Sequence, residues 1–395
     1  MNLRLATLFL VSTFASVAAA ADQIFVPITS MDWSDALGLR AHTNHLLYTG
    51  AWYSDQEGPF FWDWYANGRS ASPAGYHPED IRGAYGDSAQ GTGAIAIVDA
   101  YNYATALADF NVFAKQFGLP QETSTSATSS SNKVLQVVYA SGSKPSNDSG
   151  WAEEEALDIE WAHAMAPNAK IYLVEAANNS FSALAQAVRT AVSLSGVKQV
   201  SMSWGGSEFG GEASFDSAFN SKTVTYFASA GDQGGVPEYP AESPDVVAVG
   251  GTSLKVTNQQ YVAEAAWSGS GGGPSAYEPM PLFQRSVKTV TSKHRIGPDI
   301  AAVADPSTGV AVYDSTPYYG YVGWMVFGGT SVASPVCAGL ANAGAANRGA
   351  GELTWIYTSP AKFNDITSGS AGGYSATVGW DYVTGWGSPK TTGSL

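Results

Sequence analysis

The sequence is short of cysteine, of basic residues and of long apolar runs. Its 395 residues include one cysteine, Cys337, so no intrachain disulfide can form and stability must come from packing or bound ions. Lys and Arg number 19 against 34 Asp and Glu, which leaves a formal net charge of −15. Nucleic acid and anionic membranes require a basic surface, so both are excluded as partners. Beyond the first twenty residues, no apolar run is long enough to cross a bilayer.

The remaining composition is that of a folded protein with a large core. Hydrophobic residues make up 45% of the chain and aromatic residues 12%, whereas only 13% are charged. A chain of this length can bury a large apolar core, as one large domain or two ordinary ones.

The first twenty residues read as a signal peptide. Met1 to Arg4 supply a positive start, Leu5 to Val17 a mostly apolar stretch, and Ala18 to Ala20 a small-residue cleavage site. We therefore expect an exported, soluble protein.

Residues 21–75 differ in composition and in hydrophobic pattern from the rest of the chain. They are rich in tryptophan and show no clear strand alternation. We interpret the aromatic stretch Trp52 to Tyr65 as a hydrophobic cover, although such rings could also stack on sugars.

From residue 76 to residue 395 the pattern predicts one α/β domain, in which apolar strands alternate with amphipathic helices. The expected strands cover residues 93–98, 134–139, 169–175, 199–204, 223–228 and 246–249. The expected helices cover residues 104–117, 151–165, 182–195 and 332–346. Continuous apolar strands separated by helices indicate a doubly wound, mostly parallel sheet with helices on both faces.

A first chemical motif is Gly328-Gly329-Thr330-Ser331, which leads into an Ala- and Gly-rich helix. Glycines allow a sharp turn close to a ligand, and a helix N-terminus stabilises negative charge near Ser331. This is the geometry that a nucleophilic hydroxyl requires. A simple helix cap after a glycine turn is the structural alternative.

A second motif is the acidic run from residue 153 to residue 160. On a helix, Glu154 and Asp158 face the same way as large apolar residues, so we expect both carboxylates to be buried. Two acids in a low dielectric raise at least one pKa and can share a proton. For Glu153 and Glu160 we expect the solvated face that is usual for such a run.

A third motif places Asp232 in a glycine-rich turn directly after an apolar strand. The carboxyl end of a parallel strand is where α/β proteins place their sites. The alternative is a turn residue that hydrogen-bonds to its own backbone.

Taken together and in this order, the motifs resemble those of the sedolisin family of serine-carboxyl peptidases, which share the subtilisin-like fold. The matching segments are Gly329 to Pro335, the Glu154/Asp158 pair, Ser229 to Gly234, Ser203 to Gly205 and, more weakly, Gly297 to Tyr313. Against this family, residues 21–75 read as a short pro-segment or as an N-terminal extension of another kind.

The resemblance implies a nucleophile at Ser331, a general base at Glu154, its partner at Asp158 and an oxyanion-stabilising acid at Asp232. A carboxylate base with a low pKa can accept a proton where a histidine would already be charged, and a protonated Asp232 requires low pH or a strongly raised pKa, so the activity is expected to be acidic. Ser203, Trp204 and Gly205 form a candidate edge for an extended substrate.

The resemblance also implies one calcium ion near the C-terminus. Asp365 and Asp381 would supply carboxylates, and Ile366, Thr377 and Gly379 backbone carbonyls. Calcium binds six or more oxygens, and an ion that binds only the folded state stabilises it.

The sequence therefore predicts a monomeric, secreted endopeptidase that acts on polypeptides. One alternative is a Ser/His/Asp peptidase in which Asp99 is the acid, although no histidine stands in a glycine-rich helix start. Others are a tripeptidyl-peptidase-like exopeptidase and a secreted, non-catalytic binding protein on the same scaffold.

Overall fold

The computed structural model describes residues 24–31, 40–50, 73–287 and 292–395. The expected signal peptide and the aromatic stretch from Trp52 to Tyr65 lie outside the described residues.

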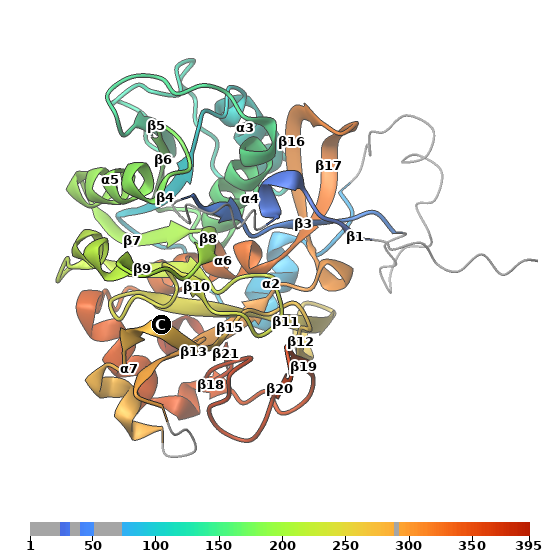
Figure 1. Ribbon diagram of the computed structural model, residues 1–395. Helices are drawn as coiled ribbons and strands as arrows, with labels where there is room; N and C mark the ends of the chain where they lie inside the picture. The colour runs from blue at the N-terminus through green and yellow to red at the C-terminus, as the bar shows by residue number, and fades with distance from the viewer. Residues whose placement is uncertain (1–23, 32–39, 51–72, 288–291) are drawn as a thin grey trace, which may run out of the picture.

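An eight-stranded sheet forms the centre of the molecule (Figure 1). Its strands are, in spatial order, β12 (Gln260–Ala266), β11 (Val247–Thr257), β9 (Thr225–Ser229), β7 (Val197–Met202), β4 (Ala94–Ala100), β6 (Lys170–Ala176) and β5 (Leu135–Tyr139), with β15 (Ile300–Val303) paired to β11. All neighbours are parallel except β11 and β12. The predicted, mostly parallel sheet is confirmed.

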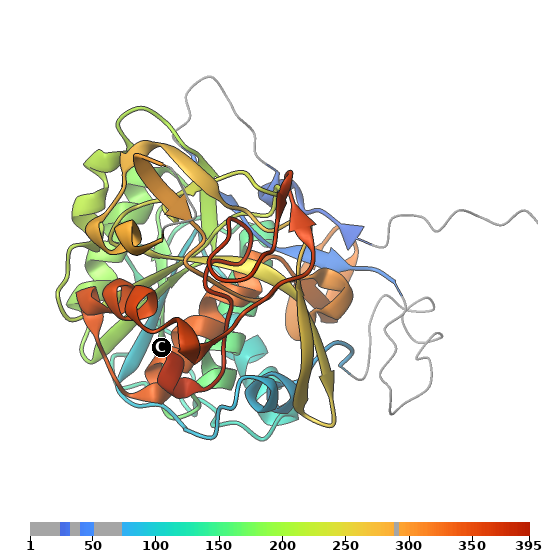
Figure 2. The ribbon, with the colours of Figure 1, turned by 90° about the horizontal axis from the view of Figure 1, so that it is seen from below.

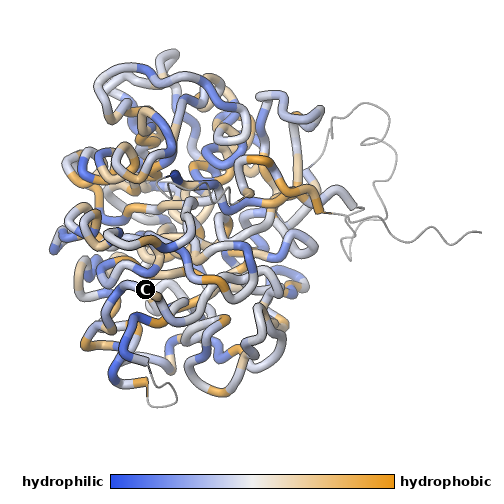
Figure 3. The backbone as a smooth tube through the Cα atoms, viewed as in Figure 1, coloured by the Kyte–Doolittle hydropathy of each residue, from blue (hydrophilic) through white to orange (hydrophobic). Residues whose placement is uncertain are grey.

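Helices cover both faces of this sheet, as predicted. They are α2 (Pro78–Ala84), α3 (Ala106–Gln116), α4 (Ser149–Met165), α5 (Phe181–Ser193), α6 (Thr330–Gly344) and α7 (Glu352–Thr358). Strand β4 shows the two layers, because Ile95 and Ile97 pack with α4 and α6 whereas Ala96 and Val98 pack with α5. The hydropathy-coloured tube shows apolar stretches through the centre and hydrophilic segments on the outer loops (Figure 3).

Two smaller sheets bring residues from the N-terminal part of the chain onto the domain. In the first, β1 (Ile24–Phe25) pairs with β3 (Leu46–Tyr48), β3 with β17 (Tyr321–Gly328), and β17 with β16 (Val310–Tyr318). In the second, β8 (Trp204–Ser207) lies between β10 (Glu238–Tyr239) and β2 (His42–Thr43). Both views place the N-terminal strands beside the β16–β17 hairpin (Figures 1 and 2).

Short strand pairs complete the C-terminal half. They are β13 (Gly273–Pro279) with β14 (His294–Gly297), β18 (Phe363–Asn364) with β21 (Ser388–Pro389), and β19 (Ser370–Ala371) with β20 (Tyr374–Ser375). Within the described part of the chain, no helix has the length and apolar character that a membrane crossing requires.

Candidate active site

Ser331 stands in the first turn of α6, directly after strand β17, and is fully buried. Gly329 makes this turn with a φ of +100°, which residues with a side chain rarely adopt. A Cβ at Gly329 would also overlap the Asn44 carbonyl oxygen and the Asp232 carboxylate. The glycine therefore brings α6 into close contact with both groups, and the turn is more than a helix cap.

The predicted acid pair lies on the buried face of α4, which begins where Asp148 accepts hydrogen bonds from Gly150 N and Trp151 N. The Ser203 hydroxyl donates to Asp158 Oδ1 at 2.7 Å. Ser331 Oγ donates to the carbonyl oxygen of Ser203 at 3.2 Å. The structure thus brings Glu154, Asp158, Ser203 and Ser331 together.

Burial dominates the electrostatics of this pair. It raises the pKa of Glu154 well above its ordinary value, and the Ser331 hydroxyl is the strongest group that opposes the rise. Burial likewise raises the pKa of Asp158, and the nearby Asp99 and Glu154 carboxyls raise it further. Glu154 Oε1 has no hydrogen-bond partner among the described residues, so it is available to a proton.

Asp232, in the turn after β9, contacts Thr330, the residue before Ser331. Its Oδ1 accepts hydrogen bonds from Thr330 N at 2.7 Å and from Thr330 Oγ1 at 2.8 Å. Its buried Oδ2 finds no partner within the described part of the chain. Burial raises the pKa of Asp232 well above its ordinary value, and the two hydrogen bonds from Thr330 oppose the rise.

The expectation for Glu153 and Glu160 was wrong. Both side chains are fully buried rather than solvated. Glu153 lies 3.2 Å from His45 Nε2, and Glu160 accepts a hydrogen bond from Tyr313 N at 3.0 Å. Helix α4 is enclosed by the sheet, by β16 and by the segment that contains His45, so it has no solvent face for these acids.

Sequence reasoning missed the segment Arg40–Tyr48, which crosses the site. The Asn44 carbonyl accepts a hydrogen bond from Ser331 N at 3.0 Å, and Asn44 N donates to Glu154 Oε2 at 3.1 Å. His45 Nδ1 lies 2.9 Å from the same Glu154 oxygen. No motif marks this segment. Its histidines, His42 and His45, stand in no glycine-rich helix start, and only the predicted substrate edge Ser203–Gly205 indicates that an extended partner lies beside it.

His45 is not placed to act as the base of a Ser/His/Asp peptidase. Its two ring nitrogens face Glu154 and Glu153, and neither is hydrogen-bonded to Ser331. Within the described residues, both oxygens of Asp99 lack a hydrogen-bond partner, so Asp99 holds no imidazole. Burial raises the pKa of Asp99, and the nearby Glu154 carboxyl raises it further.

The predicted substrate edge is paired. In β8, Trp204 lies opposite Thr43 and Gly205 opposite His42, in antiparallel register. Asn44 N continues the ladder with a hydrogen bond to Ser203 O at 3.3 Å. The edge therefore binds an extended chain, which here is a part of this protein.

The expected calcium ligands gather around one loop. Asp365 accepts hydrogen bonds from Gly379 N at 3.1 Å, and Asp381 accepts one from Thr377 N at 3.0 Å. Gly379 has a φ of +82°, which turns the loop back on itself. Ile366 is buried. The oxygen-rich set fits calcium, although N–H groups occupy the two carboxylates and no cluster of three or more His, Cys, Asp or Glu forms among the described residues.

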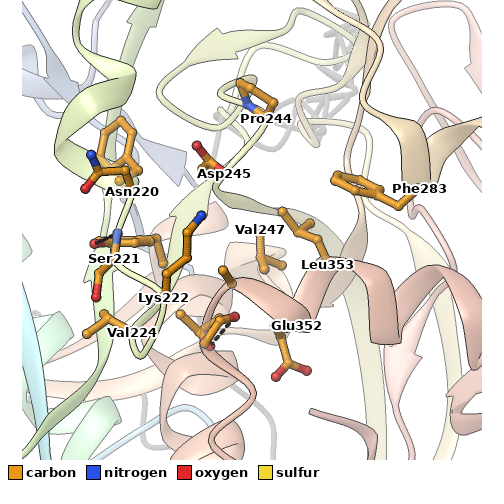
Figure 4. A pocket seen from close by; sticks show the side chains of 15 residues that line it. Asn220, Ser221, Lys222, Val224, Pro244, Asp245, Val247, Phe283, Glu352 and Leu353 are labelled. Atoms are coloured by element: carbon orange, nitrogen blue, oxygen red, sulfur yellow. Dashed lines mark hydrogen bonds between the residues drawn. The ribbon is translucent and has the colours of Figure 1, made fainter.

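A pocket in the structure lies away from the candidate active site. Figure 4 shows Lys222, Asp245 and Glu352 among the side chains that line it. Its lining also includes Thr225, at the start of β9, whereas Asp232 follows the end of that strand. The pocket therefore opens at the opposite edge of the sheet, and it contains none of the predicted site residues.

A buried hydroxyl, an acid pair and a third acid at one edge of a parallel sheet define a subtilisin-like α/β protein. Comparison with protein families agrees, since residues 137–387 match the model described as "Subtilase family". The match covers more than half of the chain, and the chain belongs to the subtilase family.

Among curated proteins, the chain is similar to sedolisins. It is 30% identical over 364 residues to sedolisin of Pseudomonas sp. (strain 101), covering 80% of this chain and 60% of the relative. It is 32% identical over 367 residues to kumamolisin of Bacillus sp. (strain MN-32), covering 82% of this chain and 64% of the relative. The chain thus spans less than two thirds of either relative.

A solved structure extends this similarity to the fold. Pseudomonas sedolisin, a serine-carboxyl proteinase solved in complex with pseudo-iodotyrostatin, aligns with a TM-score of 0.66 and 29% identity. The alignment covers 82% of this chain and 97% of that structure. The predicted resemblance to sedolisins is confirmed.

Proposed function

We propose that this protein is a serine-carboxyl endopeptidase that acts on polypeptides at acidic pH. One observation carries the proposal: the main-chain carbonyl of Asn44 accepts a hydrogen bond from Ser331 N. Asn44 N donates to Glu154, and a Cβ at Gly329 would overlap both the Asn44 carbonyl oxygen and Asp232. A peptide bond thus lies where a nucleophile, a base and an acid converge. The similarity to sedolisins supports the same conclusion.

The reaction proceeds through an acyl-enzyme on Ser331. Glu154, as a carboxylate, accepts the Ser331 proton while Oγ attacks the substrate carbonyl carbon, and Asp158 stabilises the proton on the pair. Ser331 N and protonated Asp232 donate hydrogen bonds to the developing oxyanion. Glu154 then passes the proton to the leaving amine, and afterwards activates the water that releases the acyl group.

The course of segment Arg40–Tyr48 favours an endopeptidase over an exopeptidase. A chain lies on both sides of Ser331, through β2 on one side and β3 on the other. A site that cuts three residues from a free N-terminus would have to close after the third residue. A non-catalytic binding protein on the same scaffold would be expected to have lost at least one of the four site residues, and Glu154, Asp158, Asp232 and Ser331 are all present.

Cleavage of denatured protein between pH 3 and pH 7 tests the proposal. The wild-type chain should cut at internal bonds with an acidic optimum, and Ser331→Ala should not cut. Equal cleavage by both proteins would refute the proposal, and an optimum above pH 7 would point to a histidine base. We further propose that the protein acts as a secreted monomer, which size-exclusion chromatography of the culture medium tests.

We also propose one calcium ion at the loop of Asp365 and Asp381, with carbonyl oxygens of Ile366, Thr377 and Gly379. When bound, the ion would supply stability and no chemistry, since the loop shares no residue with the catalytic groups. Its oxygen-rich ligands and the turn at Gly379 support the proposal. Thermal unfolding with and without added calcium tests it.

A further inference from the structure

A group of carboxyls lies beyond the end of strand β8, apart from the catalytic groups. Glu208 directly follows the last residue of β8, and Glu212 begins the short 3₁₀ helix Glu212–Ser214. Glu278 belongs to β13, which packs against this helix. Glu212 is 0% exposed and Glu278 is 1% exposed. Because β8 contains the predicted substrate edge, these acids lie where that edge ends.

Glu208 connects the end of β8 to β13. One of its oxygens accepts a hydrogen bond from the Ser275 hydroxyl, and the other accepts one from Ala276 N at 2.9 Å. The Ser275 oxygen itself accepts hydrogen bonds from Tyr277 N at 3.1 Å and from Glu278 N at 2.8 Å. A hydroxyl has a single proton, so Ser275 donates it to Glu208. Both Glu208 oxygens are therefore acceptors, as in a charged carboxylate.

Glu212 lies beside Glu208 and can bond to it only through a proton. Its Oε2 accepts a hydrogen bond from Phe209 N at 2.7 Å, and its buried Oε1 has no donor among the described residues. The Glu208 carboxylate is within hydrogen-bonding reach of the Glu212 side chain. Two carboxyls this close attract each other only when one is protonated. Since Glu208 already accepts from two donors of β13, the proton belongs to Glu212.

The surroundings of Glu212 favour its protonated form. Burial is the main reason that its pKa is raised to about 9. The hydrogen bond from Phe209 N opposes the rise, and the nearby Glu208 and Glu278 carboxyls add to it. Burial also raises the pKa of Glu278 to about 7 and that of Glu242 to about 8. The other titratable or charged groups that act on these carboxyls are Asp216, Tyr239, Asp299 and Arg295.

We propose that Glu212 is a positioning residue whose proton closes the turn after β8 onto Glu208, and so holds the substrate edge against β13 at acidic pH. Loss of this proton places two charged carboxylates side by side, with Glu278 nearby, so the turn and the end of β8 separate from β13. The inference rests on the proposed peptidase function. It adds a pH-dependent step of substrate binding that is distinct from the proton transfers at Ser331.

The direction of the pH dependence follows from the proton. In the open state Glu212 is in water and has an ordinary pKa near ~4. Between about pH 5 and pH 8, opening therefore releases one proton from Glu212, and the opening equilibrium constant rises about tenfold per pH unit through this group. The stabilisation of the closed turn is complete below about pH 4 and is lost as the pH approaches about 9.

Hydrogen exchange of the backbone N–H groups in residues 204–216 tests the proposal, after correction for the intrinsic pH dependence of exchange. The measurement uses Ser331→Ala as the parent protein and requires no activity. Between pH 5 and pH 8 the protection of these residues should fall as the pH rises. Glu212→Gln keeps a neutral donor toward Glu208 and releases no proton on opening. In this variant the decline of log protection per pH unit should be smaller by about one.

Glu352→Gln is the matched control. Burial raises the pKa of Glu352 to about 7, but this residue lines the pocket at the opposite edge of the sheet. Its variant should keep the slope of the parent protein. An unchanged slope in Glu212→Gln, or the same reduction in both variants, would overturn the proposal whether or not the chain is a peptidase. Protection that does not change with pH in the parent would overturn it as well.

Ser275→Ala provides a second variant, which leaves every acid in place and removes one donor to Glu208. Because a hydrogen bond to a carboxylate is lost, the protection of residues 204–216 at pH 4 should fall by about tenfold or more. Unchanged protection in a folded Ser275→Ala would overturn the proposed connection between β8 and β13.

Peptide hydrolysis separates positioning from catalysis. At pH 4, Ser275→Ala should raise KM about tenfold and leave kcat within about twofold, because β8 holds the substrate and not the reacting atoms. In wild type KM should rise between pH 4 and pH 7, and in Glu212→Gln it should rise less. A loss confined to kcat would overturn the positioning role. If wild type cleaves no peptide, the proposed function fails, whereas the exchange measurement still decides whether the turn closes through a proton.

Discussion

Two pairs of carboxylates in this protein have opposite surroundings. Glu154 and Asp158 on α4 are fully buried, and each has one oxygen without a hydrogen-bond partner among the described residues. Asp381, in the C-terminal loop, accepts hydrogen bonds from the backbone N–H groups of Thr377, Val383 and Thr384. Asp365 accepts from Gly379 N with both oxygens.

The difference separates the carboxylates that we propose to be reactive from those that hold a loop in place. Backbone donors favour the charged form of Asp381 and oppose the rise that burial causes in its pKa. Glu154 and Asp158 receive fewer such donors, so burial keeps their pKa values raised and a proton can move between them. Removing a reactive carboxylate should therefore change activity, whereas removing a structural one should change stability.

The largest expected effect is that of Ser331→Ala. Without the hydroxyl no acyl-enzyme forms, so kcat/KM on a peptide should fall by at least ~10³-fold. Ser334→Ala is the matched control on the same helix, since Ser334 Oγ bonds to Ser201 Oγ at 2.9 Å and touches no reactive group. Similar losses in the two variants would show that the helix had been disturbed.

Glu154→Gln should follow, with a loss of about 10³-fold in kcat, because the amide cannot accept the Ser331 proton. Glu160→Gln is the control from the same helix, since Glu160 contacts Tyr313 N and not Ser331. It should retain activity within a few-fold. Comparable kcat losses in both would mean that buried charge on α4, rather than the base, controls the rate.

Asp232 should set the alkaline limit of activity. It donates only while protonated, so activity should fall as the pH rises through its raised pKa. Asp232→Ala should lose about 10²-fold in kcat. Asp232→Asn keeps a neutral donor, so it should lose less and remain active to higher pH. A pH profile of Asp232→Asn that coincides with wild type would contradict this role.

Stability should fall as the pH rises, because buried acids take up protons on folding. Burial raises the pKa of Glu153 to about 7, of Glu175 to about 8 and of Asp314 to about 7. Each folded value lies above the unfolded one near 4, so each group's contribution is complete below about pH 4 and is lost as the pH approaches the folded value. Thermal unfolding between pH 4 and pH 8 should show a falling Tm.

One variant isolates this dependence. Glu155 is fully buried and neither of its oxygens has a partner within the described residues, and burial raises its pKa well above the ordinary value. Glu155→Gln should flatten the decline in unfolding free energy by up to ~1.4 kcal/mol per pH unit. Gln121→Ala, at an exposed and uncharged side chain, should leave the slope unchanged, and equal slopes in all three proteins would contradict the linkage.

The smallest effect is expected at the C-terminal loop. If calcium binds there, a chelator should lower the Tm of wild type by several degrees and that of Asp365→Asn by less, because the variant lacks one carboxylate ligand. Activity at low temperature should be the same in both. A chelator effect of equal size in the two proteins would place the ion elsewhere.

Local patterns predicted much of this molecule. The apolar strands and the helices fell within a few residues of their predicted positions, because a buried parallel strand needs a continuous apolar run. Strand β11 extends to Thr257 beyond its apolar start and pairs there with β12, and the hairpin of β16 and β17 has no counterpart among the predicted strands. The prediction of a solvated face for Glu153 and Glu160 was wrong, because a helix enclosed on all sides has no face toward solvent.

By itself, the sequence predicted the fold class and the candidate site residues, since each depends on residue type and short spacing. A glycine that permits a positive φ before Ser331, or two acids four apart on a helix, can be read locally. Only the tertiary structure decided what lies opposite these groups. The pairing of Asn44 with Ser331 joins positions 287 residues apart, and backbone hydrogen bonds between such distant segments leave no mark on either stretch of sequence.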